Sequence, residues 1–324
     1  MTAKVFPHDL YHGTIAVYDS LIICWNPKLQ NCFFNIFNLD SGREIGYFCN
    51  KGRGPGEFSS VNPVFQLFKK DGDLITILSP HSERKLMFWN ISKSIKQSET
   101  IYDQIIEFEN NRSNYNCIFY QNEDTLFAQV RSLFISEEEE EALPSYFEQQ
   151  TSYGKDIIRD FHIYKEKRLI NLKTHISPSD FFCSDDIIKP DGSKFVQAMW
   201  FLPQLNIVDT HTGKVEAFRI KKGVDFSFFK TDMKPLITYY LRIQVDDNYI
   251  YTVYVGKNTK DASNNGLLYN TIHLYDWYGN HLYELIVDRD FSTIWLDPVR
   301  NRLYTIDFDT DEVCYLILDE LLKK

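Results

Sequence analysis

The stretch "DGDLITIL", residues 71–78, decides the fold because its pattern returns along the whole chain. A polar turn precedes a short run of β-branched, aromatic and aliphatic residues, which is typical of a turn that leads into a strand. Six copies occur at separations of 53, 52, 69, 55 and 53 residues, anchored on Leu21, Leu74, Leu126, Phe195, Ile250 and Leu303. A period of about fifty residues indicates a repeat architecture.

Each copy is followed by a second strand and, in most copies, by a turn and a third strand. Asp40-Ser41-Gly42 and Thr212-Gly213 supply such turns, because Gly, Asn and Asp tolerate positive φ. A weaker apolar stretch ahead of each anchor completes a four-stranded antiparallel meander. Such a meander cannot bury both faces alone, so we expect an all-β, six-bladed β-propeller whose ring is closed by an N-terminal strand around Lys4–Leu10.

One propeller domain over residues 1–324 accounts for the length, and 25 Phe and 20 Tyr suit β-structure. The interval of 69 residues predicts an insertion at about 133–156, between the second and third strands of the third blade. Ser136 and Glu139 fit a capping box, which predicts a short helix. We interpret the acidic run Glu137–Glu141 as a solvated helix face, with contact to a basic partner as the alternative.

The charge balance argues against two classes of partner. The chain has 35 Lys and Arg against 45 Asp and Glu, a net charge of −10, which predicts binding neither to nucleic acid nor to anionic membranes. The sequence lacks the run of about 18 apolar residues that a membrane-spanning helix needs. His8 and Asp9 interrupt the N-terminal segment where a signal peptide needs an apolar stretch. We therefore expect a soluble cytoplasmic protein as written, or a periplasmic or exported one if a leader was removed.

The cysteines are scattered, mostly within apolar runs, and show no C-x-x-C pair and no Cys/His metal spacing. We interpret them as buried free thiols, which favours a reducing compartment. They are Cys24, Cys32, Cys49, Cys117, Cys183 and Cys314.

The segment "NKGRGPGEF", residues 50–58, combines three glycines and a proline between two strand-like stretches. It matches neither G-x-x-x-x-G-K-[ST] nor a G-x-G-x-x-G that opens a helix. Pro55 also removes a backbone N–H that an anion site would use. The segment is therefore interpreted as a connection between strands rather than a phosphate site.

The motif "GRGPGEF" resembles the G-x-G-P-G-E-[FY] signature of the bacterial TolB-like six-bladed propellers, a group largely without assigned activity. In that group the motif joins the outermost strand of one blade to the innermost strand of the next. The resemblance implies the propeller fold and an exported, often lipid-anchored, setting in relatives. The sequence as given shows neither their leader nor their lipobox cysteine, and the resemblance transfers no catalytic residue.

Known enzymatic propellers provide further tests. The sequence contains no S-x-D-x-G-x-T-W box of the sialidases and no G-x-S-x-G of the serine hydrolases. Many acidic residues are present, but no motif selects a calcium-binding set of the lactonase type. We therefore predict no cofactor and keep calcium only as part of the alternative hypothesis of a lactonase-type enzyme. His8 and His12 are spaced i, i+4, yet Pro7 disfavours the helix that would place both on one face, so we interpret them as surface histidines.

With no enzymatic motif found, we expect binding at the centre of the ring, because the innermost strands of a propeller converge on a channel. Any one of these residues could instead be structural: Glu57 could accept from amides of its own turn, and Arg53 could pair with a neighbouring blade. The polar and aromatic residues expected at the channel mouth are Tyr11, His12, Arg53, Glu57, Asn62, Tyr115, Tyr239, Tyr240 and Arg242.

The sequence leads to a non-enzymatic propeller that binds a protein, peptide or small ligand on one face or in the central channel. The alternative is a divalent-metal hydrolase of the lactonase type in the channel, and a third hypothesis is a purely structural assembly module. The sequence leaves the ligand and the oligomeric state open.

Overall fold

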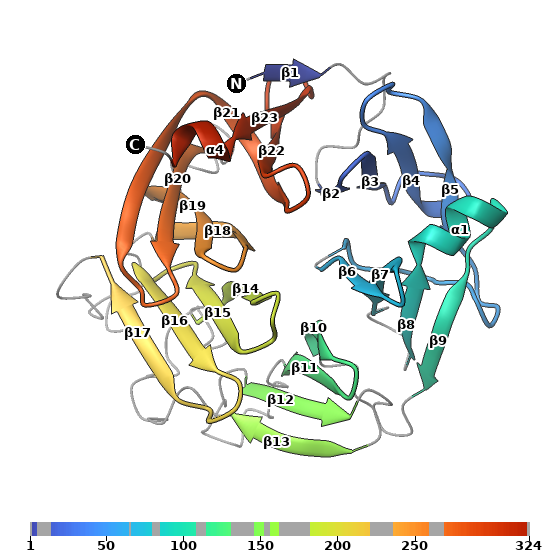
Figure 1. Ribbon diagram of the computed structural model, residues 1–324, viewed down its shortest axis with the longest axis horizontal. Helices are drawn as coiled ribbons and strands as arrows, with labels where there is room; N and C mark the ends of the chain where they lie inside the picture. Colours follow the sequence, from blue (N-terminus) through green and yellow to red (C-terminus); the bar gives the residue numbers. More distant parts are fainter. Residues whose placement is uncertain are drawn as a thin grey trace.

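The computed structural model describes residues 2–4, 14–64, 66–79, 85–107, 115–130, 146–151, 156–161, 182–220, 236–258 and 269–322. Their strands form sheets arranged in a ring, with β2, β6, β10, β14 and β18 nearest its centre (Figure 1). Each of these five is the first strand of its antiparallel meander. The β-propeller class predicted from the repeat is therefore confirmed.

Four of the sheets have four strands each, and every strand pairs with its neighbour in the sequence. In each of these sheets the second strand contains the apolar anchor of its repeat, which is buried except for the half-buried Leu21. The strands are β2 (Thr14–Tyr18), β3 (Leu21–Trp25), β4 (Cys32–Asn38) and β5 (Glu44–Asn50); β6 (Phe68–Lys70), β7 (Asp73–Leu78), β8 (Lys85–Asn90) and β9 (Tyr102–Glu107); β10 (Tyr115–Asn122), β11 (Thr125–Val130), β12 (Tyr146–Thr151) and β13 (Ile157–Phe161); β14 (Ser184–Ile188), β15 (Lys194–Met199), β16 (Gln204–Asp209) and β17 (Val215–Arg219).

The fifth sheet has seven strands in the order β1-β23-β22-β21-β20-β19-β18 and contains the last two repeats. Its long strand β21 pairs with β20 and β22, and Phe291 lies opposite Tyr269 on one side and Asp307 on the other. The strands are β18 (Ile237–Val245), β19 (Tyr249–Asn258), β20 (Tyr269–Asp276), β21 (His281–Asp297), β22 (Arg302–Asp307), β23 (Val313–Ile317) and β1 (Thr2–Lys4), and helix α4 (Leu318–Leu321) follows β23.

The prediction of six blades is therefore wrong, because the described strands form a ring of five sheets. Residues 281–297 contain no Gly, Pro or Asn, so nothing in this segment breaks the strand between the fifth and sixth repeats. Between the first two blades, by contrast, residues 51–64 contain three glycines and two prolines, and the strand ends there. Six sequence repeats thus give five sheets.

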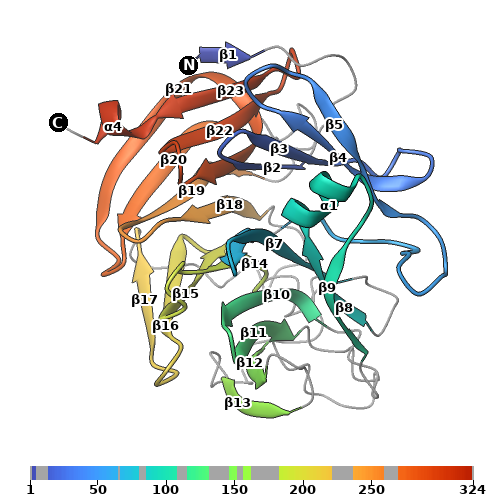
Figure 2. The same ribbon diagram turned by 45° about the vertical axis from the view of Figure 1, so that its right-hand side comes forward.

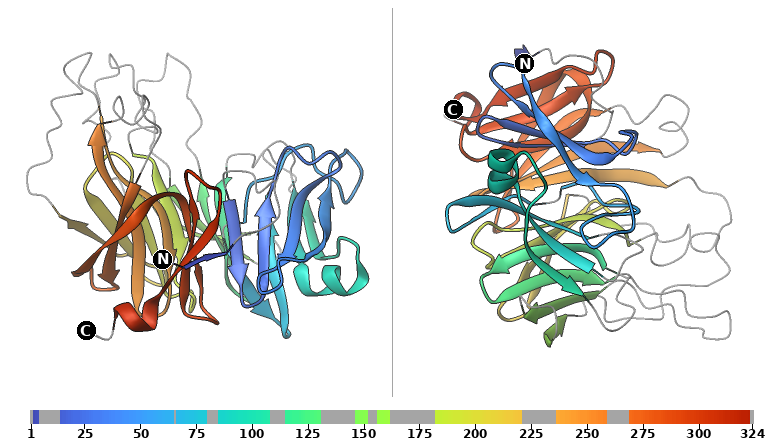
Figure 3. Two further views of the ribbon diagram at one scale, coloured as in Figure 1. Left: turned by 90° about the horizontal axis from the view of Figure 1, so that it is seen from above. Right: turned by 90° about the vertical axis from the view of Figure 1, so that its right-hand side faces the viewer.

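The N-terminus lies on the fifth sheet, where β1 pairs with β23 in the register Thr2↔Tyr315 (Figure 2). We expected an outer strand around Lys4–Leu10; the observed strand lies earlier, and of the expected range only Lys4 is among the described residues. Figure 3 shows that both chain ends lie on the side of the ring formed by this sheet.

The fifth sheet is joined to the first blade by side chains of the last repeat. The Arg300 guanidinium donates to both carboxylate oxygens of Asp40, at 2.8 and 2.7 Å, and to Asp19 at 3.2 Å. The Trp295 indole N–H donates to the Val17 carbonyl at 2.9 Å. A bidentate Arg–carboxylate pair fixes orientation as well as distance, so these contacts hold the two ends of the ring in register.

Two elements of the described chain depart from the sequence reading. Helix α1 (Ile91–Gln97) interrupts the second blade, where a turn was expected; the Asn90 side chain caps it by accepting from the Lys93 N–H at 2.8 Å. Strand β12 lies inside the predicted insertion, which spanned about 133–156. Its polar residues Glu148, Gln149 and Gln150 are buried, a composition that hid the strand pattern. Residues 131–145, with the predicted capping box and acidic helix, lie outside the described residues.

Aromatic side chains fill the spaces between blades. The Trp89 ring lies 5.1 Å from the Phe34 ring and 6.0 Å from the Phe48 ring, between the first two blades. Phe195 of the fourth blade contacts Phe127 and Phe147 of the third, with ring centroids 4.8 and 4.7 Å apart. The sheets therefore bury their faces against one another, as the repeat requires.

The Gly52–Glu57 turn has a packing constraint of its own. The Glu57 carboxylate accepts from the Gly54 N–H at 2.9 Å, and a Cβ on Gly52 would lie 1.9 Å from the same Oε2. We expect Gly52→Ala to displace this carboxylate and to lower the free energy of unfolding by about 1 kcal/mol, the value of one hydrogen bond. Urea unfolding of Gly52→Ala, Glu57→Ala and the double variant measures the coupling free energy between positions 52 and 57. If the two single effects simply add, the steric explanation is contradicted, because the double variant has no carboxylate to displace.

Candidate functional site

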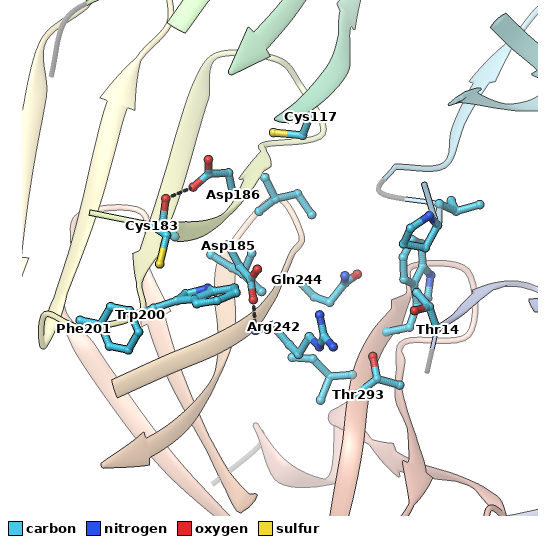
Figure 4. A pocket seen from close by; sticks show the side chains of 17 residues that line it. Thr14, Cys117, Cys183, Asp185, Asp186, Trp200, Phe201, Arg242, Gln244 and Thr293 are labelled. Atoms are coloured by element: carbon cyan, nitrogen blue, oxygen red, sulfur yellow. Dashed lines mark hydrogen bonds between the residues drawn. The ribbon is translucent and has the colours of Figure 1, made fainter. Parts of the chain in front are cut away.

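The inner strands enclose a cavity of about 480 Å³ at the centre of the ring. Its described walls come from β2, β10, β14, β18 and β21, and from the segments that follow β5 and β15. Figure 4 shows side chains from these elements facing a common space. Most walls are apolar or aromatic, and the polar side chains are concentrated on β14 and β18.

Arg242 enters the cavity from a bulge in β18. Leu241 pairs with Val253 and Ile243 pairs with Thr252, so Arg242 is the extra residue of the bulge. Its φ is +53°, in the left-handed region, and its backbone N–H donates to the Asp185 carboxylate. The side chain is exposed, and its guanidinium forms a hydrogen bond with the Tyr269 hydroxyl. Within the described part of the chain no carboxylate forms an ion pair with it.

The neighbouring Gln244 is oriented by the fifth sheet. Its Oε1 accepts from the backbone N–H of Leu296 at 3.3 Å. Because a backbone N–H can only donate, this contact identifies the oxygen and leaves the amide nitrogen as the remaining donor. Arg242 and Gln244 lie next to each other on β18 in Figure 4, both facing the space between β14 and Thr14.

Asp185 and Asp186 are consecutive on β14 and point to different sides of it. Asp185 accepts from the Arg242 backbone, whereas one oxygen of Asp186 accepts from the Ser184 hydroxyl at 2.6 Å. The other oxygen of Asp186 is buried and has no hydrogen-bond partner among the described residues. Burial raises the pKa of Asp186 well above its ordinary value, although the Ser184 hydroxyl acts in the opposite direction. The cavity therefore contains one carboxyl group that favours the neutral form.

Trp200 and Phe201 form an aromatic wall beyond β15, with ring centroids 6.4 Å apart. The indole nitrogen of Trp200 is buried, and no residue in the described part of the chain accepts from it. Ile187, Ile243, Ile294 and Trp295 extend the apolar lining. Aromatic and aliphatic walls with a few polar groups are typical of small-molecule sites.

Of the residues predicted at the channel, only Arg242 is among the described residues that line the cavity. Glu57 bonds within its own turn, Arg53 is exposed outside the cavity, and Asn62 is buried just before the lining residues Pro63 and Val64.

The remaining predicted residues lie elsewhere or cannot be placed. Tyr240 is fully buried, with its hydroxyl 2.7 Å from that of Tyr275, and the half-buried Tyr239 packs against the same hydrophobic cluster between the fourth blade and the fifth sheet. Tyr11 and His12 lie outside the described residues, and only the backbone of Tyr115 is described, in β10.

Sequence reasoning missed Asp185, Asp186, Trp200 and Gln244. The signal for the acids was present, because "SDDII" places two carboxylates on an innermost strand that should be mainly apolar. Gln244 follows Arg242 by two residues and would be expected on the same strand face. Trp200 gave no signal, since tryptophan in an apolar run is ordinary core composition.

Neither a metal site nor a membrane span emerges from the described residues. Among them, no group of three or more His, Cys, Asp or Glu side chains is arranged to hold a metal ion. No helix in the described part of the chain is long and apolar enough to cross a membrane. All six cysteines are described and are free thiols, as predicted, with Cys32 and Cys183 only partly buried.

Comparison with known proteins supports the fold and leaves the function open. The sequence matches no family model and no curated protein. A chain of hydrazine synthase from Kuenenia stuttgartiensis is similar at a TM-score of 0.53 and 10% identity, over 94% of this chain and 82% of that one. A provisionally assigned exported protein from Bacteroides fragilis reaches 0.52 at 15% identity, over 94% and 82%. In all, 968 chains of solved structures match, so the fold by itself does not select an activity.

Fold and similarity together place the chain in the β-propeller fold class. This fold is compatible with a binding role.

Proposed function

We propose that the protein is a non-enzymatic binding propeller that holds a small ligand in its central cavity. The observation that carries this proposal is the guanidinium of Arg242, which has no ion-pair partner among the described residues and is presented to the cavity from a strained bulge. A bulge re-aims a side chain at a local cost in strand pairing, and such bulges are common beside binding sites.

The left-handed backbone at Arg242 belongs to a β-bulge rather than to a turn. Asp19 and Asp71 also have positive φ, but both lie in the hairpin turns between the first and second strands of their blades, where this conformation is expected. Arg242 lies inside a strand, as does Cys49 of β5, and a non-glycine residue in the left-handed region costs about 1–3 kcal/mol. Of the two, only Arg242 is among the described residues that line the cavity. A residue held there without a carboxylate partner in the described chain is a candidate for recognition rather than for stability.

Thermal unfolding of the intact chain against a panel of small organic acids, amino acids, neutral sugars and calcium tests the proposal. A ligand of the native state stabilises it, by about 2.7 kcal/mol at one hundred times its Kd. We expect at least one organic member of the panel to raise the melting temperature, and Arg242→Gln to abolish that rise. Arg53→Gln is the matched control, because Arg53 is exposed and lies outside the cavity lining.

Two results would overturn the proposal: no member of the panel stabilises the wild type, or Arg242→Gln responds as the wild type does. Stabilisation by calcium alone, unaffected by Arg242→Gln, would favour the lactonase-type hydrolase instead. The Arg242→Gln variant also distinguishes a ligand in the cavity from a protein partner on one face of the ring. Binding of a partner on the face would not depend on Arg242.

The resemblance of Gly52–Phe58 to the TolB-like signature accords with a propeller fold, although five blades depart from the six of that group. For the compartment, the six free thiols favour a reducing environment.

A further inference from the structure

Two side chains of β18 present hydrogen-bond donors to the cavity. The Arg242 guanidinium, one of whose groups is bound to the Tyr269 hydroxyl, has no carboxylate partner among the described residues. The Gln244 oxygen accepts from Leu296, which leaves its amide nitrogen as the donor for a ligand. Both side chains project from β18 towards the same space (Figure 4). A planar guanidinium matches the two oxygens of a carboxylate, and an adjacent amide N–H₂ adds a further donor.

Each of the two acidic groups of the cavity accepts one hydrogen bond from the described chain, and the second oxygen of Asp186 has no described partner. The Asp185 carboxylate accepts from the Arg242 backbone N–H, and Asp186 accepts from Ser184. Burial raises the pKa of Asp186, so its carboxyl group favours the neutral form and repels an anion less. In this acidic chain, the positive charge of Arg242 is the group of the cavity that offsets the negative charge of a bound anion.

The rest of the cavity calls for an apolar body. Trp200 and Phe201 form one wall, and Ile243, Ile294 and Trp295 form others. A volume of about 480 Å³ falls within the range of about 300–1,000 Å³ that is usual for organic ligands.

Resting on the proposed cavity function, we infer that the ligand is an apolar monocarboxylate, with its carboxylate on Arg242 and Gln244 and its apolar body against Trp200 and Phe201. Such a group occurs in a small organic acid and at the C-terminus of a peptide that ends in an apolar residue. The two sources share the same chemistry at Arg242 and differ in the size of the group attached to the carboxylate.

Titration calorimetry with matched pairs tests this inference on the intact chain. The first pair is indole-3-acetate and indole-3-acetamide, which share a shape and differ in charge. The second is a tetrapeptide ending in leucine, with a free or an amidated C-terminus. We expect a free acid to bind at least about ten-fold more tightly than its amide, because hydrogen bonds to charged groups are the stronger ones. Binding of indole-3-acetate identifies the small acid as the source, and binding of the peptide alone identifies the C-terminus.

Gln244→Glu is the sharpest variant. The new carboxylate still accepts from the Leu296 N–H, so the local structure is kept while a donor is replaced by a like charge. We expect it to weaken binding of the acid at least about ten-fold and to leave the amide unchanged, a difference that loss of folding would not produce. Arg53→Gln again serves as the control with unchanged binding of the acid.

The outcomes separate this inference from the proposed function. If amides bind as tightly as acids, or if only a neutral compound stabilises the protein in an Arg242-dependent way, the carboxylate assignment is wrong and the binding function stands. If no compound of the pairs or the panel binds, both are wrong.

Discussion

Gly192→Ala is expected to lower the free energy of unfolding by about 3 kcal/mol or more, because steric and backbone strain would act together. Gly192 has a φ of +71°, and an added Cβ would lie 2.5 Å from the backbone oxygen of Gln121 in the third blade. Its own carbonyl accepts from Gln121 Nε2 at 3.1 Å and from the Thr210 hydroxyl at 2.6 Å. Moving this turn would therefore break the polar contact between the third and fourth blades.

Gly72→Ala is the matched control for this prediction. Gly72 occupies the same turn of the second blade and has a φ of +86°, but no atom of the described residues lies within 4 Å of its Cβ position. Its cost should be limited to backbone strain, about 1–2 kcal/mol. Urea unfolding of both variants measures the difference. Equal losses would contradict the packing explanation and leave φ as the only cause.

The stability of the wild type is expected to fall as the pH drops from about 6.5 to about 4, because of His273. His273 is 4% exposed, its ring stacks on Tyr254 at 4.2 Å, and its Nε2 has no hydrogen-bond partner within the described ranges. Burial, assisted by the nearby His281, lowers its pKa from 6.5 to about 4. Below pH 6.5 the unfolded chain binds a proton that the native state excludes, so unfolding becomes easier. At pH 5 the loss is about 2 kcal/mol relative to pH 7.5.

His273→Gln, which does not titrate, should lose this part of the pH dependence. The groups that face His273 are the hydroxyl of Tyr275, whose oxygen lies 3.3 Å from Nδ1, the ring of His281, and the Glu284 carboxylate 3.9 Å from Nε2. Glu284 opposes the shift, but its side chain is 52% exposed and solvent screens its charge. The measurement is the free energy of unfolding of both proteins at pH 7.5 and 5. A difference that does not change with pH would show that the native state accepts the proton on His273.

The regular spacing of the repeat predicted the fold class, because the buried second strand of each blade must contain an apolar run that begins near a polar turn. Leu74 in β7, Phe195 in β15 and Leu303 in β22 all lie where the period put them. The predicted number of blades was wrong because the repeat period carries no information about how strands of neighbouring repeats pair. Whether two repeats form two sheets or one depends on hydrogen bonds on both sides of β21, where Phe291 pairs with strands from both repeats.

The candidate site was much less predictable. Arg242 was anticipated as a polar residue on an innermost strand, and it lines the cavity. Tyr240 was anticipated for the same reason, yet it is fully buried between sheets, because the bulge at Arg242 and another near Tyr239 change which side chains face the channel. A bulge depends on the partner strand, so its effect on side-chain direction is not readable from one strand alone.

By itself the sequence determined that this chain forms repeated antiparallel meanders packed face to face, since apolar periodicity and turn residues are local properties. It also determined that the cysteines stay unpaired, because their scattered spacing offers no disulfide framework. Only the tertiary structure decided that the last two repeats share one sheet and that Arg242, Gln244 and Trp200 line one cavity. These features depend on strand register and on contacts between different sheets, which no local pattern encodes.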